Sequence, residues 1–383
     1  MKSMIKVVLG TLVTSLVSVS AMAQLQLDEE GKFTAYADFR TRFEADWDSS
    51  RSSGSDRDDR GRMRMRARLG FRYQSSDNVT WEVRVRSGSD ESHQSPHITL
   101  VDFDNNDTGN TDFNFDKYYL KYDFGNSSTW VGKNSLPFWK QNEMFWDDDV
   151  TPMGLGYNYS RNGVQFNLGY FSLPVGMKEA SGNLGLAQVV YSWSMGEAGF
   201  DLAAGFLGFD ANETDVDAGM LLDGNGARDY ELWILSAKSV FNGGAKPLEF
   251  GLDYMVNGED YSRTDPNAFT AFNRDEDTGY VVTIKYGQTS NPGDWQLAYY
   301  YADIETFAVN SSYSQDDWMR WGSADETRSS NFDGHELRFV YALSNQVQLV
   351  FRNYIVDANV RRSATSAARE DGNRFRFDIN YSF

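Results

Sequence analysis

The last residues of the chain read Phe375-Arg376-Phe377-Asp378-Ile379-Asn380-Tyr381-Ser382-Phe383. Apolar side chains alternate here with charged and polar ones, and successive side chains of a β-strand point to opposite faces. One face of this segment is therefore apolar throughout, while the other is polar. The pattern predicts a β-strand that separates an apolar environment from a wet one, and it decides the fold because it recurs along the chain.

The same period-two alternation recurs in many other segments. It is found at 33–43, 63–73, 79–85, 118–124, 129–133, 155–159, 164–170, 187–195, 200–206, 230–240, 248–256, 280–286, 295–301, 337–341 and 347–351. Together with the terminal segment, these predict about 16 strands. The segment 230–240 is nearly continuous in its apolar residues and is one of the weakest matches to the pattern.

The connections between these segments alternate in length. The long ones cover 46–61, 87–114, 134–154, 172–185, 208–229, 257–277, 304–334 and 356–373. The short ones cover 74–78, 125–128, 161–163, 196–199, 242–246, 287–293 and 342–346, and they are rich in Gly, Asn and Ser. An even number of strands joined in this way is typical of transmembrane barrels. The sequence therefore predicts an all-β, antiparallel transmembrane β-barrel with short periplasmic turns and long extracellular loops.

The N-terminal segment has the features of a secretory signal peptide. Positive charges at Lys2 and Lys6 precede a mostly apolar run at 7–19, and Ala21 and Ala23 stand where a signal peptidase reads small residues. A transmembrane anchor is the alternative, but the uncharged run is short for a membrane span. We expect residues 1–23 to be a cleaved signal peptide and residues 24–383 to form a single barrel domain.

Composition excludes several function classes. The chain has no Cys, three His and a formal net charge of -19, so we expect no disulfide, no cofactor and no affinity for nucleic acid. His93 and His97 are four residues apart, a spacing that could serve a shared metal, but the residues around them are typical of a loop. Asp102, Asp104 and Asp107 could hold calcium through their carboxylate oxygens. A solvated acidic surface explains the aspartates more simply, so we predict no metal site.

The polar face of the strands is expected to line a wet interior. Arg62, Arg64, Arg66 and Arg68 alternate with apolar residues along one segment. A charged side chain facing the bilayer midplane costs about 2 to 4 kcal/mol, so the arginines should point inward and the apolar set should meet lipid. A barrel of this size is also too wide for side chains to fill. These considerations predict a channel.

The third long connection is far more apolar than the others. It carries Phe138, Trp139, Phe145 and Trp146, so we expect it to pack against another part of the protein. At this point the whole mature chain resembles the Gram-negative outer-membrane general porins, and most closely the 16-stranded "putative porin" group. Two stretches look like the sequences of that group. They are Arg62-Met63-Arg64-Met65-Arg66-Ala67-Arg68-Leu69-Gly70 and the stretch from Val131-Gly132-Lys133 to Pro137-Phe138-Trp139.

The resemblance implies that the third loop folds into the lumen and narrows it, with acidic groups facing a basic barrel wall. The basic candidates are Arg40, Arg42, Arg62, Arg64, Arg66, Arg68, Arg84, Arg86, Arg374 and Arg376; the acidic candidates are Glu143, Asp147, Asp148 and Asp149. Opposed charges across a narrow opening would favour small polar or charged solutes. We expect about half of these arginines to pair instead with carboxylates of neighbouring strands, such as Glu44 or Glu82.

The implied function is passive diffusion of small hydrophilic solutes and ions across the bacterial outer membrane. A channel specific for small anions, such as phosphate or carboxylates, remains open as an alternative. An enzyme is disfavoured, because only His335 lies near a strand end beside acidic residues. The resemblance also implies a homotrimer, contacts with lipid and lipopolysaccharide, and recognition of the C-terminal Tyr381 and Phe383 by the barrel assembly machinery.

Overall fold

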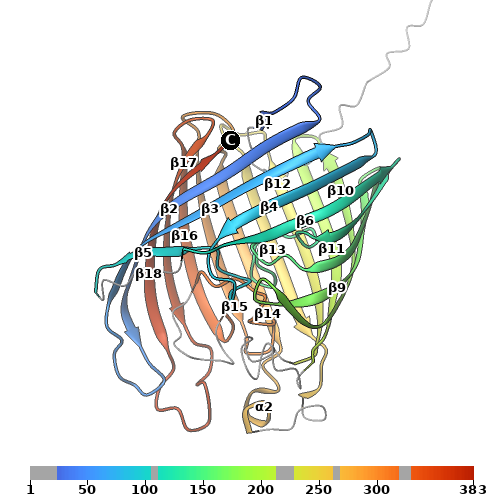
Figure 1. The fold of residues 1–383 in the computed structure, drawn as a ribbon. Helices are drawn as coiled ribbons and strands as arrows, with labels where there is room; N and C mark the ends of the chain where they lie inside the picture. The colour runs from blue at the N-terminus through green and yellow to red at the C-terminus, as the bar shows by residue number, and fades with distance from the viewer. Residues whose placement is uncertain (1–23, 105–110, 213–227, 262–267, 319–328) are drawn as a thin grey trace, which may run out of the picture.

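The computed structural model describes residues 24–104, 111–212, 228–261, 268–318 and 329–383, so the predicted signal peptide lies outside the described residues. Within them, sixteen antiparallel strands form a closed barrel, and two further strands extend the same sheet. The barrel closes because its last strand pairs with its first, with Phe377 opposite Phe43 (Figure 1). A closed sheet leaves no unpaired edge along the wall. The predicted fold class is confirmed.

The barrel strands follow one another around the wall in chain order. They are β2 (Phe33–Ser50), β3 (Arg60–Gln74), β4 (Val79–Ser87), β6 (Phe113–Phe124), β7 (Ser127–Lys133), β8 (Met153–Arg161), β9 (Val164–Val175), β10 (Glu179–Met195), β11 (Ala198–Asp210), β12 (Tyr230–Phe241), β13 (Leu248–Asn257), β14 (Thr278–Gly287), β15 (Trp295–Ile304), β16 (Phe332–Ala342), β17 (Val347–Asp357) and β18 (Asp371–Ser382). Each predicted segment lies on one of these strands. Most of the strands extend further into the long connections than the alternation alone indicated.

Two short strands were not predicted. β1 (Leu25–Gln26) pairs with β2, and β5 (Ile98–Asp102) pairs with the Arg62–Met65 part of β3. β4 covers only the other part of β3, from Arg68 to Gln74, so β5 continues the wall where β4 has ended. Both strands are too short to show a periodic pattern in the sequence.

The alternation of long and short connections is confirmed, with one correction. Residues 172–185 were expected to form a long loop, but β9 and β10 continue through them and leave only residues 176–178 between the strands. Leu173 and Val175 are fully buried inside the barrel, so the inward apolar pattern continues where Gly, Ser and Pro suggested a loop. β9 and β10 are therefore longer at their loop ends than the sequence predicted.

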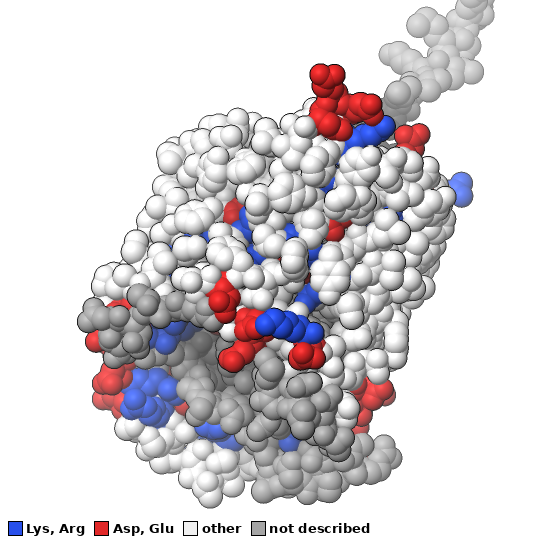
Figure 2. Space-filling model, viewed as in Figure 1, with Lys and Arg blue, Asp and Glu red and all other residues white. Residues whose placement is uncertain are grey.

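The outer face of the barrel carries the exposed apolar residues. Leu120, Leu155, Leu168, Leu202 and Trp233 are among the large apolar side chains that remain exposed on the strands. Figure 2 shows mostly uncharged atoms on the barrel wall and larger groups of charged atoms toward its ends. This is the surface expected for a barrel that meets lipid.

The interior has two unlike halves. The wall formed by β2–β4 and β16–β18 is polar and rich in arginine, as predicted. The prediction was wrong for parts of β9–β13, where the inward residues Leu184, Leu207, Leu232 and Met255 are apolar and fully buried, although inward residues such as Gln188 and Asp253 on the same strands are polar. These residues belong to one packed cluster with apolar residues of loops that enter the barrel. Inward packing on one face and lipid on the other explain why the segment 230–240 is nearly continuous in apolar residues.

The described residues include one short helix, α2 (Ala268–Asn273), in a long connection. It lies at the end of the molecule opposite to the C-terminus (Figure 1). In the part of the chain that the structure describes, no helix has the length and apolar character needed to cross a membrane.

Candidate functional site

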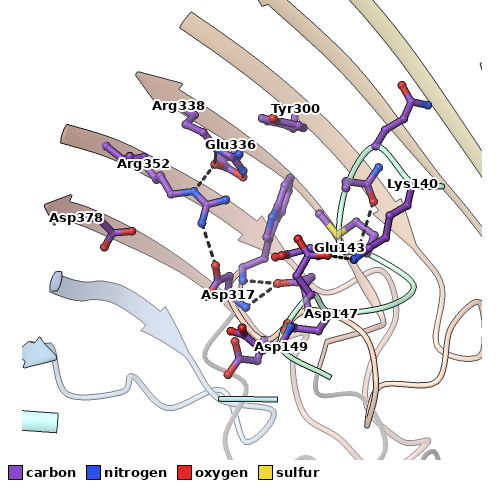
Figure 3. Close-up of a pocket in the computed structure, with 18 of the residues that line it drawn as sticks. Lys140, Glu143, Asp147, Asp149, Tyr300, Asp317, Glu336, Arg338, Arg352 and Asp378 are labelled. Atoms are coloured by element: carbon purple, nitrogen blue, oxygen red, sulfur yellow. Dashed lines mark hydrogen bonds and ion pairs between the residues drawn. The ribbon is translucent and has the colours of Figure 1, made fainter. Parts of the chain in front are cut away.

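A cavity of about 740 Å³ lies inside the barrel between its arginine-rich wall and two long loops (Figure 3). We call residues 134–152 loop three and residues 305–331 loop seven; residues 319–328 of loop seven are outside the described ranges. All four acidic candidates of loop three line the cavity, but among the ten arginine candidates only Arg40, Arg66 and Arg68 do. Loop seven contributes Gln315, Asp316, Asp317 and Trp318.

The apolar side of loop three packs against the apolar half of the wall. Phe145, Trp146 and Val150 are at most 1% exposed, which confirms that this loop is packed inside the protein. Phe138 lies directly over Gly205 of β11, where an added Cβ would come within 2.2 Å of the phenyl ring. A glycine is therefore needed at this point of close approach.

Polar contacts fix the position of the same loop. The side-chain amide of Gln188 accepts a hydrogen bond from the Trp139 N–H and donates one to the Trp139 carbonyl, both at 2.8 Å. The Asp253 carboxylate accepts hydrogen bonds from the amides of Gln141 and Asn142, at 3.0 and 2.5 Å. These bonds join loop three to β10 and β13. The loop is thus attached to the wall by apolar packing and by directional bonds to two strands.

Loop seven also enters the barrel, which the sequence did not predict. The Tyr313 ring stacks on Trp146 of loop three, with 5.5 Å between ring centroids and 8° between planes. The backbone N–H of Asp147 donates to the Tyr313 carbonyl at 2.7 Å, and the N–H of Gln315 donates to the Glu143 carbonyl at 2.9 Å. The two loops therefore form one continuous hydrogen-bonded unit inside the barrel.

The connection between β4 and β6 supports this unit from its other side. His93 donates from Nε2 to the Ser312 carbonyl and accepts at Nδ1 from the Gly176 N–H. The Gln94 amide donates to the carbonyls of Ser311 and Ser314, at 3.1 and 2.6 Å. Both nitrogens of His93 are thus engaged, Nε2 with loop seven and Nδ1 with the turn between β9 and β10.

Nothing in the described residues supports a metal at the histidine pair. Among these residues, no group of three or more His, Cys, Asp or Glu side chains could hold a metal ion. His97 lies at the cavity, where burial and then the charges of Arg42 and Arg64 hold its pKa well below the usual range. Asp102 accepts a hydrogen bond from the Asp104 N–H, and Asp107 lies outside the described residues.

The three arginines at the cavity each have a carboxylate partner. Arg66 pairs with Asp38 at 2.7 Å, Arg68 pairs with Asp149 of loop three, and Arg40 lies 3.8 Å from Asp378. Asp149 therefore reaches across to the wall and touches it, instead of facing it over open space as the resemblance implied.

The other seven arginine candidates lie in contacts that join strands and loops. Arg42 pairs with Asp378, Arg62 and Arg64 with Glu44, Arg84 with Asp116, Arg374 with Asp46, and Arg376 with Glu44, while Arg86 donates to the carbonyls of His93 and Asp149. Glu44 is thus a shared partner, as expected, whereas Glu82 pairs with Arg72, which was not a candidate. More than half of the candidates take part in such contacts.

The acidic candidates of loop three differ in their charge. Burial and then the negative charge of Asp148 raise the pKa of Glu143 to about 7. Burial and then Glu143 raise the pKa of Asp147 well above its usual range. The ammonium of Lys140, 2.6 Å away, lowers the pKa of Asp148. At neutral pH the loop is therefore less negative than its composition indicates.

Several residues of the cavity were missed by the sequence analysis. Glu336 accepts hydrogen bonds from both Arg338 and Arg352, and the Arg338 guanidinium lies 4.6 Å from the centre of the Tyr300 ring. The alternation of β16 and β17 could have found these residues, because they occupy inward positions. Asp317 carries no periodic signal, and it was missed because the fold of loop seven was not foreseen.

Comparison with known proteins agrees with this architecture. The model of a family described as "Putative porin" matches residues 33–176. The comparison with curated protein sequences finds no match.

Solved structures share the fold across nearly the whole chain. The high-pH structure of Pseudomonas putida OprB has a TM-score of 0.58 and 13% identity, and the alignment covers 92% of this chain and 94% of that one. A Salmonella typhi OmpF complex with daunomycin has a TM-score of 0.54 and 11% identity, with 94% and 100% covered. A mutant of the Rh. blastica porin has a TM-score of 0.50 and 12% identity, with 92% and 100% covered. At these identities the likeness concerns the fold.

Proposed function

We propose that this chain is a porin of the bacterial outer membrane and that it filters small hydrophilic solutes and ions between an arginine-rich wall and acidic loops. Porins are channels for passive diffusion and not enzymes, and the barrel fold and the family match both belong to this class. The observation that carries the filter is the cavity of about 740 Å³, which is lined by charged groups of both signs from the wall and from two loops. The transported solutes are not bound covalently or changed.

The distribution of charge supports this filter. On the polar half of the wall, the ion-paired arginines outnumber the strand carboxylates that pair with them. The arginines are Arg40, Arg42, Arg60, Arg62, Arg64, Arg66, Arg68, Arg72, Arg84, Arg338, Arg352, Arg374 and Arg376; the carboxylates are Asp38, Glu44, Asp46, Glu82, Asp116, Glu336 and Asp378. Loops three and seven supply further negative charge. A field across the opening follows, and it favours polar and charged solutes over apolar ones.

The contacts at the cavity favour general diffusion over a channel specific for anions. Among the described lining residues, Arg40, Arg66, Arg68, Arg338 and Arg352 each have a carboxylate oxygen within 4.0 Å. A tight site for phosphate or a carboxylate would have to displace these partners, and each displacement would leave a partly buried charge without its partner. We therefore place the anion-specific channel second.

Liposome swelling separates the two functions. Purified full-length protein would be reconstituted into liposomes and challenged with neutral, anionic and zwitterionic solutes of similar size. General diffusion predicts swelling rates that fall smoothly with solute size and differ by less than about tenfold between charge classes. Fast uptake of one class of anion, with saturation and with inhibition by that same anion, would contradict the general filter and support the specific channel.

We also propose that the barrel assembles as a homotrimer within outer-membrane lipid and lipopolysaccharide. A small outward residue supports close approach of a neighbour near the barrel seam, where Ala37 of β2 exchanges backbone hydrogen bonds with Phe383. Light scattering of the protein in detergent, corrected for bound detergent, would give three times the chain mass. A single chain mass under mild extraction would contradict this assembly.

The end of β18 supports the proposed recognition by the barrel assembly machinery. Tyr381 is exposed on the outer face, and the backbone of Phe383 exchanges two hydrogen bonds with Ala37, at 2.9 and 3.0 Å. We expect Phe383→Ala to lower the amount of heat-resistant, assembled barrel in the outer membrane. Unchanged assembly would contradict the signal. Sequencing of the mature N-terminus tests the predicted cleavage before Gln24.

A further inference from the structure

One carboxylate of loop seven lies among three arginines from three strands of the wall. Asp317 lies 3.5 Å from Arg42 of β2 and 2.9 Å from Arg352 of β17, and it also pairs with Arg376 of β18. Figure 3 shows Asp317 at the cavity with a contact to Arg352. These strands meet at the seam where the barrel closes, so residues far apart in the sequence surround a single loop residue.

Two of these arginines depend on Asp317 for one of their guanidinium nitrogens. The side chains of Arg42 and Arg376 are 0% and 2% exposed. Their Nε atoms donate to the wall carboxylates Asp378 and Glu44, while in both residues the Nη1 atom makes no regular hydrogen bond and faces Asp317. Without Asp317, these buried guanidinium groups would keep only part of their countercharge.

The position of Asp317 is fixed by its neighbours. Its N–H donates to the Gln315 side chain at 2.6 Å, and its carbonyl accepts from Arg374 at 2.8 Å. The next residue, Trp318, is buried and packs edge-on against Tyr354, with 5.7 Å between ring centroids. Both the backbone and the carboxylate of Asp317 are therefore held at the wall.

Asp317 is also ionised over the whole physiological range. Burial opposes the charge, but Arg376, Arg42 and Arg352 together hold the pKa of this carboxyl well below its usual range. Its side chain is still 18% exposed, and it lines the cavity. A permanent negative charge thus stands where solutes pass.

We propose that Asp317 is a selectivity-determining residue, which offsets the arginines at the seam and so keeps the opening permeable to cations. The inference rests on the proposed filter and extends it, because it assigns to loop seven a role that the resemblance gave to loop three alone. A residue that only fastened loop seven would change the width of the opening. A residue that sets selectivity changes the ratio of cation to anion permeability.

The test is the reversal potential of the purified full-length channel across a KCl gradient. A unit charge roughly 7 Å from the path of an ion in water changes its local concentration by about threefold. Asp317→Asn should therefore lower the ratio of K⁺ to Cl⁻ permeability by about threefold or more. Asp275→Asn is the matched control, because this carboxylate is 93% exposed outside the cavity and its loss should leave the ratio unchanged.

A second variant separates charge from loop position. Arg352→Gln removes one arginine of the same group, so it should raise the permeability ratio, and the double variant Asp317→Asn with Arg352→Gln should return it toward the wild-type value. A higher conductance with an unchanged ratio in Asp317→Asn would overturn the proposal and leave Asp317 as a fastening residue. If Asp317→Asn did not fold, an unchanged ratio in Arg352→Gln would overturn it.

These outcomes can be told apart from failure of the proposed function. A wild-type protein that is folded but forms no channels would contradict the filter itself. A wild-type channel whose permeability ratio is insensitive to both variants would contradict only the role of Asp317.

Discussion

The ion selectivity of this channel should depend on pH near neutrality, because of Glu143. Burial and the charge of Asp148 raise the pKa of this carboxyl to about 7. A carboxyl group is neutral below its pKa and negative above it. Loop three therefore gains negative charge as the pH rises through 7, and the preference for cations should rise with it.

The structure sets the size of this effect. Between pH 6 and pH 8 a group with a pKa of about 7 passes from roughly one tenth to roughly nine tenths ionised. Nearly one full charge appears at the cavity, so the ratio of K⁺ to Cl⁻ permeability should rise by about threefold or more. The titratable groups around Glu143 are Asp147, Asp148, Asp317 and Lys140, and the pKa of Asp147 is itself raised. Asp148 and Asp317 have lowered pKa values and keep their charge over this range.

The assay is the reversal potential across a KCl gradient at pH values from 5 to 9. In Glu143→Gln, most of the rise in the permeability ratio between pH 6 and 8 should be lost, and the ratio should stay near the value of the wild type at low pH. Glu29→Gln, a variant of an exposed residue near β1, should keep the wild-type profile. A wild-type ratio that is flat or falls with rising pH would refute the reasoning, as would a Glu143→Gln channel that keeps the full rise.

Two further variants test how loop three is held and what it neutralises. Gly205→Ala places a Cβ within 2.2 Å of the Phe138 ring, so it should destabilise the barrel by about 1 to 3 kcal/mol, whereas Gly199→Ala on the same strand meets nothing within 4 Å. The unfolding temperature of each variant, measured by the change in gel mobility when the heated barrel unfolds, checks this prediction. Equal unfolding temperatures for the two variants would contradict the close packing of Phe138 on Gly205. Asp149→Asn removes the loop-three partner of Arg68, so the permeability ratio should shift toward anions. An unchanged ratio, or a shift toward cations, would contradict this role of Asp149.

The barrel could be predicted from the sequence because its dominant signal is local. Lipid on one side and a wet lumen on the other impose period-two alternation, which is clear in β3 and β18. The same reasoning predicted that loop three is packed, since four bulky aromatics cannot remain in water without a partner. The wall arginines were also placed on the correct face.

The arrangement of the interior was harder to predict, because it depends on contacts between distant segments. Inward leucines on β10–β12 are buried only because loops three and seven cover them, so the polar lining predicted for the whole lumen fails there. Loop seven has no periodicity, and the buried Ser311, Ser312 and Ser314 look like solvent-exposed residues in the sequence. The partners of Asp317 come from both ends of the chain, and only closure of the barrel brings them together.

The most direct test of the account is the single-channel conductance of the purified mature protein in a planar bilayer. An open cavity of about 740 Å³ inside a closed barrel predicts large steps in current that are linear in voltage. A trimer predicts that the channels close in threes. Current that stays at the baseline when correctly folded protein has been incorporated would contradict the claim that loops three and seven leave an open path through the barrel.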